Sequence, residues 1–209
     1  MKQIQDSPLC VIVTSSVAKH PLIETVRMVI DGGADVIQLR EKEMPDHKFK
    51  TLAEEMRKLT SQAGVLLIVN DRVGIAKLVA ADGAHVGQDD LPAPDARKIL
   101  GPDAILGVST HEISQARQAL ADGADYIGTG PVFPTKTKGY TEGIGTNHLR
   151  ALSSELPIPF FAIGGISLEN LDRLIGAGCR HVAVSSAIVA ADDPADAARQ
   201  FKRRLTSTR

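Results

Sequence analysis

The stretch DGGADVIQL, at residues 31–39, decides the fold because a similar phrase returns along the chain. The related phrases are ADGAHVGQ at 81–88, ADGADYIGTG at 121–130 and GAGCRHVAVSS at 176–186. In each phrase, a glycine that can end a helix in the left-handed conformation stands just before the start of an apolar run. A helix stop followed by a strand start, repeated along the chain, predicts repeated βα units.

Eight short apolar runs match the strands of such units. Several of them are apolar almost throughout, which is typical of parallel strands that are covered on both faces. The runs are LCVIVT (9–14), DVIQL (35–39), VLLIV (65–69), AHVG (84–87), AILGV (104–108), DYIG (125–128), FFAIG (160–164) and HVAVS (181–185).

Helical patterns separate the predicted strands. Apolar residues recur at helical spacing over 22–30, 49–59, 168–175 and 197–205. Eight strands, each followed by a helix, leave about 26 residues per unit, which suffices for a closed barrel. We therefore predict an α/β fold, a (β/α)8 TIM barrel that forms a single domain over residues 1–209. A doubly wound open sheet is the alternative, but the first βα turn lacks its GxGxxG pattern.

The composition argues against nucleic acid and membranes as partners. The formal net charge is −1 and Trp is absent, so neither a general attraction for polyanions nor a set of stacking aromatics is evident. The N-terminus has no apolar signal-peptide core, and no apolar run is long enough to span a bilayer. Cys10 and Cys179 each stand alone, which favours buried thiols in a reducing cytoplasm. The sequence leaves open whether the chain forms a homo-oligomer.

Polar residues follow nearly every predicted strand. In a βα barrel, the reactive residues lie at the carboxyl ends of the strands and in the loops that follow. Gln38 and Arg40 share one face of the second strand because side chains alternate along a strand, while Leu39 faces the helices. A surface ion pair is the simplest interpretation of any one such residue. Polar groups at nearly every strand end point instead to a site in the barrel mouth.

Two carboxylates in this set could bind a metal ion. Asp71 and Asp90 follow adjacent predicted strands, which lie about 5 Å apart, so their carboxylates could share one cation. Mg²⁺ is usually held by one or two carboxylates, waters and phosphate oxygens of a substrate, and no His/Cys cluster suggests zinc. Asp89 is the reserve candidate for Asp90, and a helix cap is the alternative role of Asp71.

Three cations are predicted around the same mouth. Arg40, Lys42 and Lys138 would add positive charge next to the two carboxylates, although Lys138 alone would be read as a solvated loop lysine. With a metal ion, the set resembles a clamp that neutralises the charge on a departing diphosphate.

A second phosphate site is predicted on the far side of the mouth. Barrels frequently bind phosphate through backbone N–H groups in the loops after the seventh and eighth strands. Gly164 and Gly165 let the backbone approach closely, and Ser185 and Ser186 stand where the next helix begins. A tight turn alone is the other interpretation of the two glycines. The loop over 130–145 is long for a βα connection, as lids often are.

An ordered set of motifs covers nearly the whole chain. The motifs are QLREK (38–42), ND (70–71), DGAHVGQDD (82–90), GVSTH (107–111), GADYIGTGPVFPTKTK (123–138), AIGGI (162–166) and VSSAI (184–188). Together they resemble the thiamine phosphate synthase family. The resemblance implies an enzyme that joins 4-amino-2-methyl-5-hydroxymethylpyrimidine diphosphate to a phosphorylated hydroxyethylthiazole, or to its carboxylate. The products would be thiamine monophosphate and diphosphate.

The resemblance also implies roles for individual residues. Lys138, Arg40, Lys42 and Ser109 would take part in catalysis, and Asp71 and Asp90 would bind Mg²⁺. The pyrimidine diphosphate site would comprise Gln38, Leu39, Arg40, Glu41, Lys42, Asn70, Ser109 and Lys138. The thiazole phosphate site would comprise Thr135, Lys136, Thr137, Gly165, Ser185 and Ser186.

Two rival functions stay open at this point. A thiazole tautomerase on a related barrel would use His111 as its general acid or base. It would have no diphosphate to expel, so the pair of Asp71 and Asp90 favours the synthase. A non-catalytic sensor on the same scaffold would need only the binding groups. The stretch over 139–142 matches no family pattern, so we expect nothing specific of a lid there.

Overall fold

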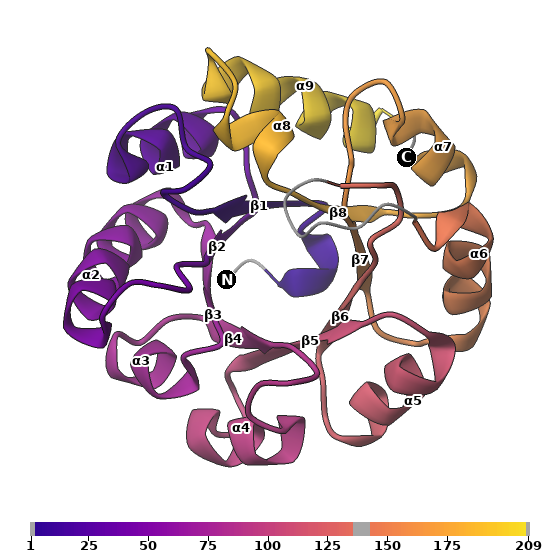
Figure 1. The fold of residues 1–209 in the computed structure, drawn as a ribbon, viewed down its shortest axis with the longest axis horizontal. Coiled ribbons are helices and arrows are strands. Elements are labelled where there is room, and N and C mark those ends of the chain that lie inside the picture. The colour runs from indigo at the N-terminus through magenta and orange to yellow at the C-terminus, as the bar shows by residue number, and fades with distance from the viewer. Residues whose placement is uncertain (1–2, 136–142, 208–209) are drawn as a thin grey trace.

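The computed structural model describes residues 3–135 and 143–207. Eight parallel strands close into a barrel in their order along the chain, and β8 pairs with β1. Figure 1 looks along the barrel and shows the strands as an inner ring and the helices as an outer ring. The strands are β1 (Leu9–Val13), β2 (Val36–Leu39), β3 (Leu66–Asn70), β4 (Gly83–Val86), β5 (Ile105–Thr110), β6 (Tyr126–Thr129), β7 (Phe160–Ile163) and β8 (His181–Val184).

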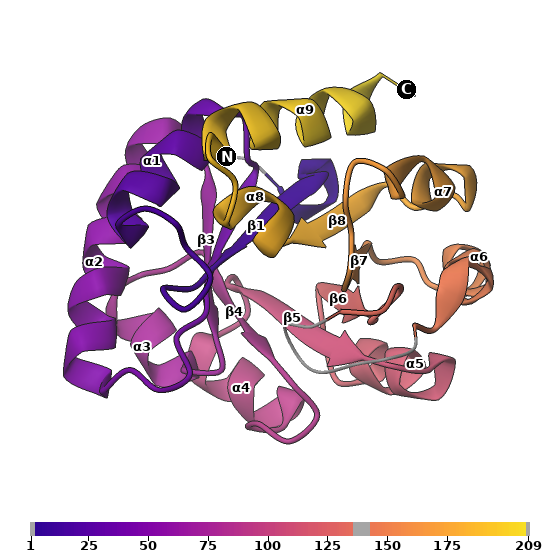
Figure 2. The ribbon, with the colours of Figure 1, turned by 45° about the horizontal axis from the view of Figure 1, so that its top comes forward.

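Helices cover the outside of the barrel. A short 3-10 helix, η1 (Ile4–Asp6), precedes β1, and its Ile4 packs into the barrel interior. The view in Figure 2 shows α9 beside α1, where the last helix completes the outer ring. The helices are α1 (Leu22–Asp31), α2 (Asp46–Ala63), α3 (Val73–Leu78), α4 (Ala93–Leu100), α5 (Ile113–Ala121), α6 (Gly145–Glu155), α7 (Leu171–Gly176), α8 (Ser186–Val189) and α9 (Pro194–Thr206).

The predicted barrel is confirmed. Each of the eight expected strands is present within two residues of its expected bounds. The closed ring of parallel strands excludes the open, doubly wound sheet that was the alternative. Among the described residues, no helix is both long and apolar enough to cross a membrane.

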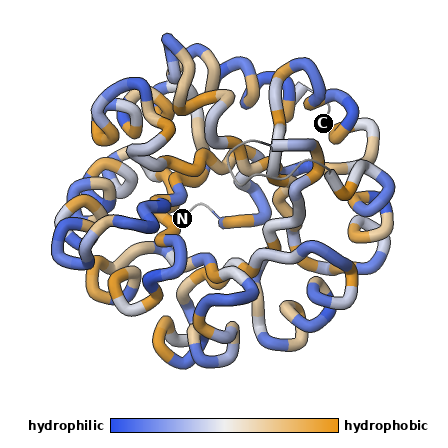
Figure 3. Tube along the Cα trace, viewed as in Figure 1, coloured by the Kyte–Doolittle hydropathy of each residue, from blue (hydrophilic) through white to orange (hydrophobic). Residues whose placement is uncertain are grey.

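Alternation along the strands divides the core into two clusters. Leu9, Val11 and Val13 of β1 face outward and pack into the layer between strands and helices. Cys10 and Ile12 face inward and join the smaller cluster that fills the barrel. This alternation is the one expected of any strand, and closure makes both faces apolar. Figure 3 shows the matching pattern in the outer helices, where hydrophobic and hydrophilic segments alternate around each turn.

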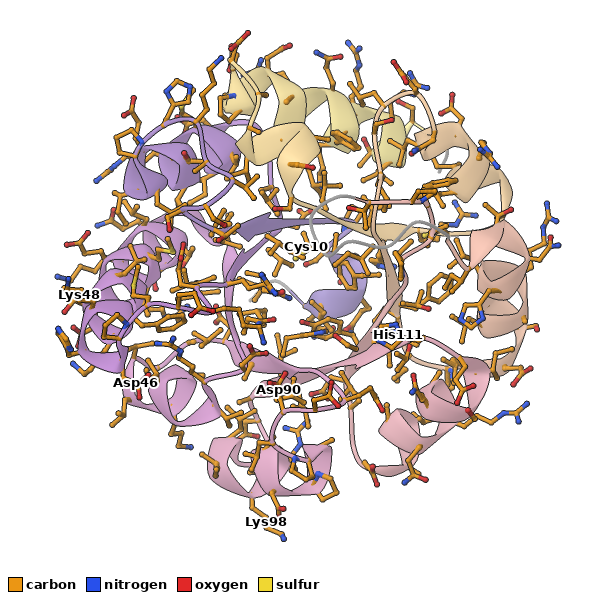
Figure 4. The ribbon with its side chains drawn as sticks, in the orientation of Figure 1. Cys10, Asp46, Lys48, Asp90, Lys98 and His111 are labelled. Atoms are coloured by element: carbon orange, nitrogen blue, oxygen red, sulfur yellow. The ribbon has the colours of Figure 1, made fainter. Side chains whose placement is uncertain are left out.

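Both cysteines are buried thiols, as the sequence predicts. Cys10 faces the interior of the barrel (Figure 4), and Cys179 packs between the barrel and the helices. Burial raises the pKa of the Cys179 thiol to about 11, and burial together with the negative charge of Asp35 raises the pKa of Cys10 further. Both side chains are therefore uncharged packing groups at neutral pH.

The repeated phrase has a structural purpose at the amino-terminal end of the barrel. Asp35, fully buried just before β2, accepts a hydrogen bond from the backbone N–H of Leu9 at 3.0 Å. The backbone N–H of Asp35 donates in return to the carbonyl oxygen of Leu9 at 2.9 Å. Lys202 of α9 pairs with the carboxylate at 2.5 Å. One side chain thus joins β1, β2 and the last helix.

The same device returns at two other places, each time with one aspartate before an even-numbered strand. Each of these carboxylates accepts a hydrogen bond from the backbone N–H of the preceding odd-numbered strand at 2.7 Å and pairs with an arginine of the helix that leads into that strand. The sets are Asp82 with Leu67 and Arg57, and Asp125 with Leu106 and Arg97.

One repeat departs from the expected helix stop. Gly33, Gly123 and Gly178 have φ values of 91°, 87° and 86° and stand just before strands, as predicted. Gly83 instead belongs to β4, and the left-handed position after α3 is held by Ala80 with φ 51°. A Cβ atom at Gly83 would lie 2.0 Å from the carbonyl oxygen of Ile105. This glycine therefore permits the close approach of two strands rather than a turn.

We predict that Asp35→Ala lowers the free energy of unfolding by about 2–4 kcal/mol, because it leaves a buried backbone N–H and the Lys202 ammonium without their acceptor. Urea unfolding followed by circular dichroism measures the change. The matched control is Asp31→Ala, an exposed aspartate of the same phrase, which should stay within about 0.5 kcal/mol of the wild type. Equal losses in the two variants would contradict the structural role of Asp35.

Candidate active site

A cavity opens at the carboxyl ends of the strands, where the sequence predicts the site. Its floor and walls carry polar groups from most of the strand ends, together with backbone of the two glycines after β7. The polar lining side chains are Thr14, Gln38, Arg40, Asn70, His85, Ser109, Thr110, His111, Thr135, Ser185 and Ser186.

The end of β2 has the geometry that alternation predicts. Gln38 and Arg40 both line the cavity, while Leu39 is fully buried in the layer between the barrel and the helices. The Leu39 side chain therefore has no access to the cavity, so any contact of Leu39 with a ligand must come from its backbone. Within the described residues, Arg40 forms no ion pair, so its positive charge is available to an anion.

Glu41 faces away from the expected ligand site. Its carboxylate is buried and accepts hydrogen bonds from the backbone N–H and, at 2.9 Å, from the hydroxyl of Ser15. These bonds join the loop after β1 to the loop after β2 at the rim of the cavity. Glu41 thus stabilises the loop that carries Arg40 and Lys42. No sequence pattern indicates its partner in the first loop.

Lys42 lies between the two carboxylates predicted to bind a metal. Its ammonium forms an ion pair with Asp71 and lies 3.8 Å from Oδ1 of Asp90. Asp71 and Asp90 are also hydrogen-bonded to each other. The two strand ends therefore bring the carboxylates together, and the position between them accommodates a positive charge.

The two carboxyl groups have pKa values shifted in opposite directions. Burial, followed by the hydrogen bond to Asp90, raises the pKa of Asp71. Burial also opposes ionisation of Asp90, but its hydrogen bonds with Asp71 and with the N–H of Gly87, and the charge of Lys42, outweigh burial and lower its pKa. The two groups therefore influence each other's ionisation, and positive charge between them favours the ionised form of both.

The backbone at Asp71 is left-handed, with φ 62°. Its N–H donates to the carbonyl oxygen of His85 at 2.8 Å, which ties the end of β3 to β4. Helix α3 begins at Val73 with Arg72 at its N-cap, and no side chain caps it. The alternative role of Asp71 as a helix cap is therefore wrong. A non-glycine residue in this conformation is strained, which is common at functional sites.

Asp90 and Asp89 differ in their surroundings. Asp90 accepts a hydrogen bond from the N–H of Gly87 at 2.8 Å, which orients its carboxylate at the inner edge of the barrel (Figure 4). Asp89 is exposed. This difference favours Asp90 over its reserve as a ligand.

Arg72 supports the loop after β2. Its Nη2 donates to three backbone carbonyl oxygens of that loop, those of Glu41 at 3.0 Å, Lys42 at 3.3 Å and Met44 at 2.5 Å. Its guanidinium also lies over the Phe49 ring, 4.3 Å from the centroid. The residue next to Asp71 thus holds the backbone that carries Lys42, and sequence reasoning missed it because a lone arginine after a strand has no distinctive pattern.

The opposite wall of the cavity has features of an anion site. Gly164 and Gly165 have φ values of 95° and 63°, and a Cβ atom at Gly165 would lie 2.4 Å from the carbonyl oxygen of Pro134. Only glycine fits this close approach. Ser185 Oγ is buried and has no hydrogen-bond partner among the described residues, although it lines the cavity. Thr135 and Ser186 line the same region.

Three of the predicted site residues, Lys136, Thr137 and Lys138, lie outside the described residues. His85 was missed, although it occupies an inward position of β4 and lines the cavity. The signal available was a histidine inside an otherwise apolar strand. His111 lines the cavity as well, and its Nδ1 lies 2.6 Å from the carbonyl oxygen of Gly130.

Comparison with known proteins agrees with this geometry. Residues 9–188 match the family described as thiamine monophosphate synthase. A thiamine-phosphate synthase of Moorella thermoacetica is 48% identical over 200 residues, which cover 95% of this chain and 95% of that protein. One from Chloroflexus aurantiacus is 48% identical over 184 residues, covering 88% of this chain and 85% of that protein.

Some relatives are longer, and one solved structure is closely similar. The thiamine-phosphate synthase of Gloeobacter violaceus is 45% identical over 187 residues, and this match covers 89% of the chain but 55% of that protein. The structure of a thiamine phosphate pyrophosphorylase from Pyrococcus furiosus superposes with a TM-score of 0.89 and 34% identity, covering 96% of each chain. From these matches and the barrel that carries them, we conclude that the chain belongs to the thiamine monophosphate synthase family of transferases.

Proposed function

We propose that this enzyme joins 4-amino-2-methyl-5-hydroxymethylpyrimidine diphosphate to a thiazole phosphate to form thiamine monophosphate. The bond between the pyrimidine methylene carbon and the diphosphate oxygen breaks, and the electron pair leaves with the diphosphate. The thiazole nitrogen then donates its lone pair to the methylene carbon, which forms the new carbon–nitrogen bond. Where the thiazole arrives as its carboxylate, CO₂ is lost as well. The cytoplasm, where unpaired thiols persist, is the location we propose for this reaction.

The single observation that carries this proposal is the position of Lys42 between Asp71 and Asp90. A cation therefore has a place between two carboxylates at the edge of the cavity. Two carboxylates, with waters and phosphate oxygens completing the shell, are a donor set that suits Mg²⁺. Within the described residues, no cluster of three or more His, Cys, Asp or Glu side chains offers a denser metal site. When bound there, Mg²⁺ would supply positive charge that stabilises the departing diphosphate.

The chain's own residues would bind and orient the diphosphate. The guanidinium of Arg40 lines the cavity and forms no ion pair within the described residues, and Lys42 follows two residues later in the same loop. Arginine and lysine both stabilise charge that accumulates on phosphate oxygens. Asn70 and Ser109 line the floor between the strand ends and can offer hydrogen bonds to the same substrate. Catalysis would then consist of ionisation and positioning, with no protein nucleophile.

The opposite wall would hold the thiazole phosphate. Ser185 Oγ is a buried hydroxyl without a hydrogen-bond partner among the described residues, and a phosphate oxygen would supply one. Gly165 keeps the backbone close to this wall, and Ser186 and Thr135 add hydroxyl groups. We assign Lys136 and Thr137 to the same site and Lys138 to the diphosphate from the family resemblance, since all three lie outside the described residues.

The rival tautomerase function would place its chemistry at His111. A carbonyl oxygen can only accept a hydrogen bond, so the contact with Gly130 leaves the proton of a neutral His111 ring on Nδ1. Nε2 would then be able to accept a proton. This reaction would not require Asp71 or Asp90, and neither would a sensor, so dependence on the metal pair separates the synthase from both rivals.

The first prediction concerns the metal. Purified protein mixed with both substrates and Mg²⁺ should form thiamine monophosphate, and a chelator should abolish it. Asp90→Asn should lower kcat/KM by about 100-fold or more, because one ligand of a charge-neutralising cation is lost.

Asp89→Asn is the matched control for this experiment, because Asp89 is adjacent and exposed. It should keep wild-type turnover. A product that forms equally well with chelator, or an Asp89 variant that loses activity while the Asp90 variant keeps it, would refute the assignment.

The second prediction concerns strain at Asp71. Asp71→Gly should abolish turnover yet leave the thermal midpoint unchanged or raised, because glycine relieves about 1 kcal/mol of left-handed backbone strain. Ala80→Gly is the control, since Ala80 has φ 51° and lies outside the site. It should stabilise the protein similarly and keep full turnover. A large loss of stability in the Asp71 variant alone would show that this residue is structural.

The third prediction concerns Arg72. Arg72→Met should speed amide hydrogen exchange in the loop over 40–45 and raise KM for the pyrimidine diphosphate by about 10-fold, because the carbonyl contacts that position Lys42 are lost. Arg27→Met, an exposed arginine of α1, is the control and should change neither quantity. Unchanged exchange in the loop of the Arg72 variant would count against its supporting role.

A further inference from the structure

A chain of hydrogen bonds runs through the barrel beneath the cavity and connects Tyr126 through His85 to Ser109. The Tyr126 hydroxyl lies 3.0 Å from Nδ1 of His85, and Nε2 of His85 lies 2.9 Å from Oγ of Ser109. Tyr126 and His85 are only 3% and 6% exposed, so water does not replace these contacts. Ser109 lines the cavity, whereas Tyr126 lies below it.

Two glycines make room for this chain. A Cβ atom at Gly107 would lie 2.2 Å from Cζ of Tyr126 and 2.5 Å from Nδ1 of His85. A Cβ atom at Gly128 would lie 3.2 Å from Cε1 of His85. Both glycines are in strands, where glycine is otherwise unfavourable, so they are consistent with space kept for the two rings.

This chain of hydrogen bonds has a direction, because a hydroxyl has a single proton to donate. Burial raises the pKa of Tyr126 well above its usual value and keeps the phenol protonated. Among the described residues, Nδ1 of His85 is the recorded hydrogen-bond partner of this buried hydroxyl. The phenol therefore donates its proton to Nδ1, because a buried hydroxyl proton without an acceptor is costly. The ring proton is then on Nε2, which donates to Ser109 Oγ, and the serine proton is left to donate elsewhere.

We propose that Tyr126 and His85 are positioning residues that hold the Ser109 hydroxyl as a hydrogen-bond donor towards an acceptor oxygen of the bound pyrimidine diphosphate. The opposite direction, with Ser109 donating to His85, would present only lone pairs to the ligand. A hydrogen-bond donor suits an anionic ligand in this cavity, which the positive charge of Arg40 also favours. The identity of the acceptor rests on the proposed function, whereas the direction of the chain does not.

Such a donor would act most strongly on the departing diphosphate. Negative charge develops on the oxygen that leaves the methylene carbon, so a hydrogen bond to it strengthens as the bond breaks. Loss of a preset donor should therefore lower kcat more than it raises KM. A merely structural role of the two rings would lower stability and leave this ratio unchanged.

The first test is the proton position on His85, read by ¹⁵N NMR of histidine-labelled protein without substrate. The chain has six histidines, and the His85→Gln spectrum identifies the signal of His85. We expect a ring protonated on Nε2 alone in the wild type and a mixture of tautomers in Tyr126→Phe. A wild-type ring protonated on Nδ1, or on both nitrogens, would overturn the proposal.

The second test is kinetic. Tyr126→Phe should lower kcat by about 10-fold, with KM for the pyrimidine diphosphate changed less than about twofold. His85→Gln, whose amide can still donate to Ser109, should retain most of the turnover, whereas His85→Leu should lose it. Equal turnover in the glutamine and leucine variants would contradict the role of His85 as a donor.

Phe161→Leu is the matched control, because Phe161 packs against Tyr126 at 5.2 Å between ring centroids without entering the hydrogen-bonded chain. It should lower the thermal midpoint yet leave both the tautomer and kcat unchanged. If Tyr126→Phe behaves as this control does, the positioning role is wrong. If the wild type forms no thiamine monophosphate, the proposed function fails. The NMR result alone then decides whether the hydrogen bonds from Tyr126 to Ser109 have the stated direction.

Discussion

Closure of eight parallel strands is the constraint on which the rest of this structure depends. Each strand position then faces either the barrel interior or the helices, and both are shielded from water. In β3, Leu66 and Ile68 face inward and fill the interior, and Asn70 follows on the same face at the strand end. The apolar interior thus becomes a polar cavity two residues further along the strand. The site is a continuation of the core pattern, with polar residues at the last inward positions.

The polar residues at the two ends of the barrel have different roles. At the amino-terminal end, Asp35, Asp82 and Asp125 bind backbone N–H groups of neighbouring strands and pair with cations of the outer helices. These aspartates are satisfied by the protein itself, so they contribute to stability. At the opposite end, Arg40 lacks an ion-pair partner and Ser185 Oγ lacks a hydrogen-bond partner among the described residues. Unsatisfied polar groups are costly unless a ligand completes them, which is why they concentrate at the cavity.

The positions of the charged groups near the cavity depend on loop backbone that is held by residues distant in the sequence. Asp71 keeps a left-handed conformation beside Asp90, and Lys42 reaches between them from the neighbouring loop. That loop is held by Arg72 through its carbonyl oxygens and by Glu41 through Ser15. Two adjacent carboxylates repel each other, so the arrangement requires a cation and a rigid frame. The buried chain through Tyr126 and His85 gives the floor of the cavity the same kind of support.

The sequence by itself determined the barrel, because strand and helix periodicity and the repeated phrase are local properties of the chain. It also predicted that Gln38 and Arg40 would share a face and that Asp71 and Asp90 would meet, since both follow from strand geometry. Only the tertiary structure showed that Glu41 binds Ser15 and that Asp82 binds a neighbouring strand as Asp35 does. It also showed that His85 links Tyr126 to Ser109 by hydrogen bonds. These contacts join residues far apart in sequence, and their partners are decided by where closure of the barrel brings each strand end.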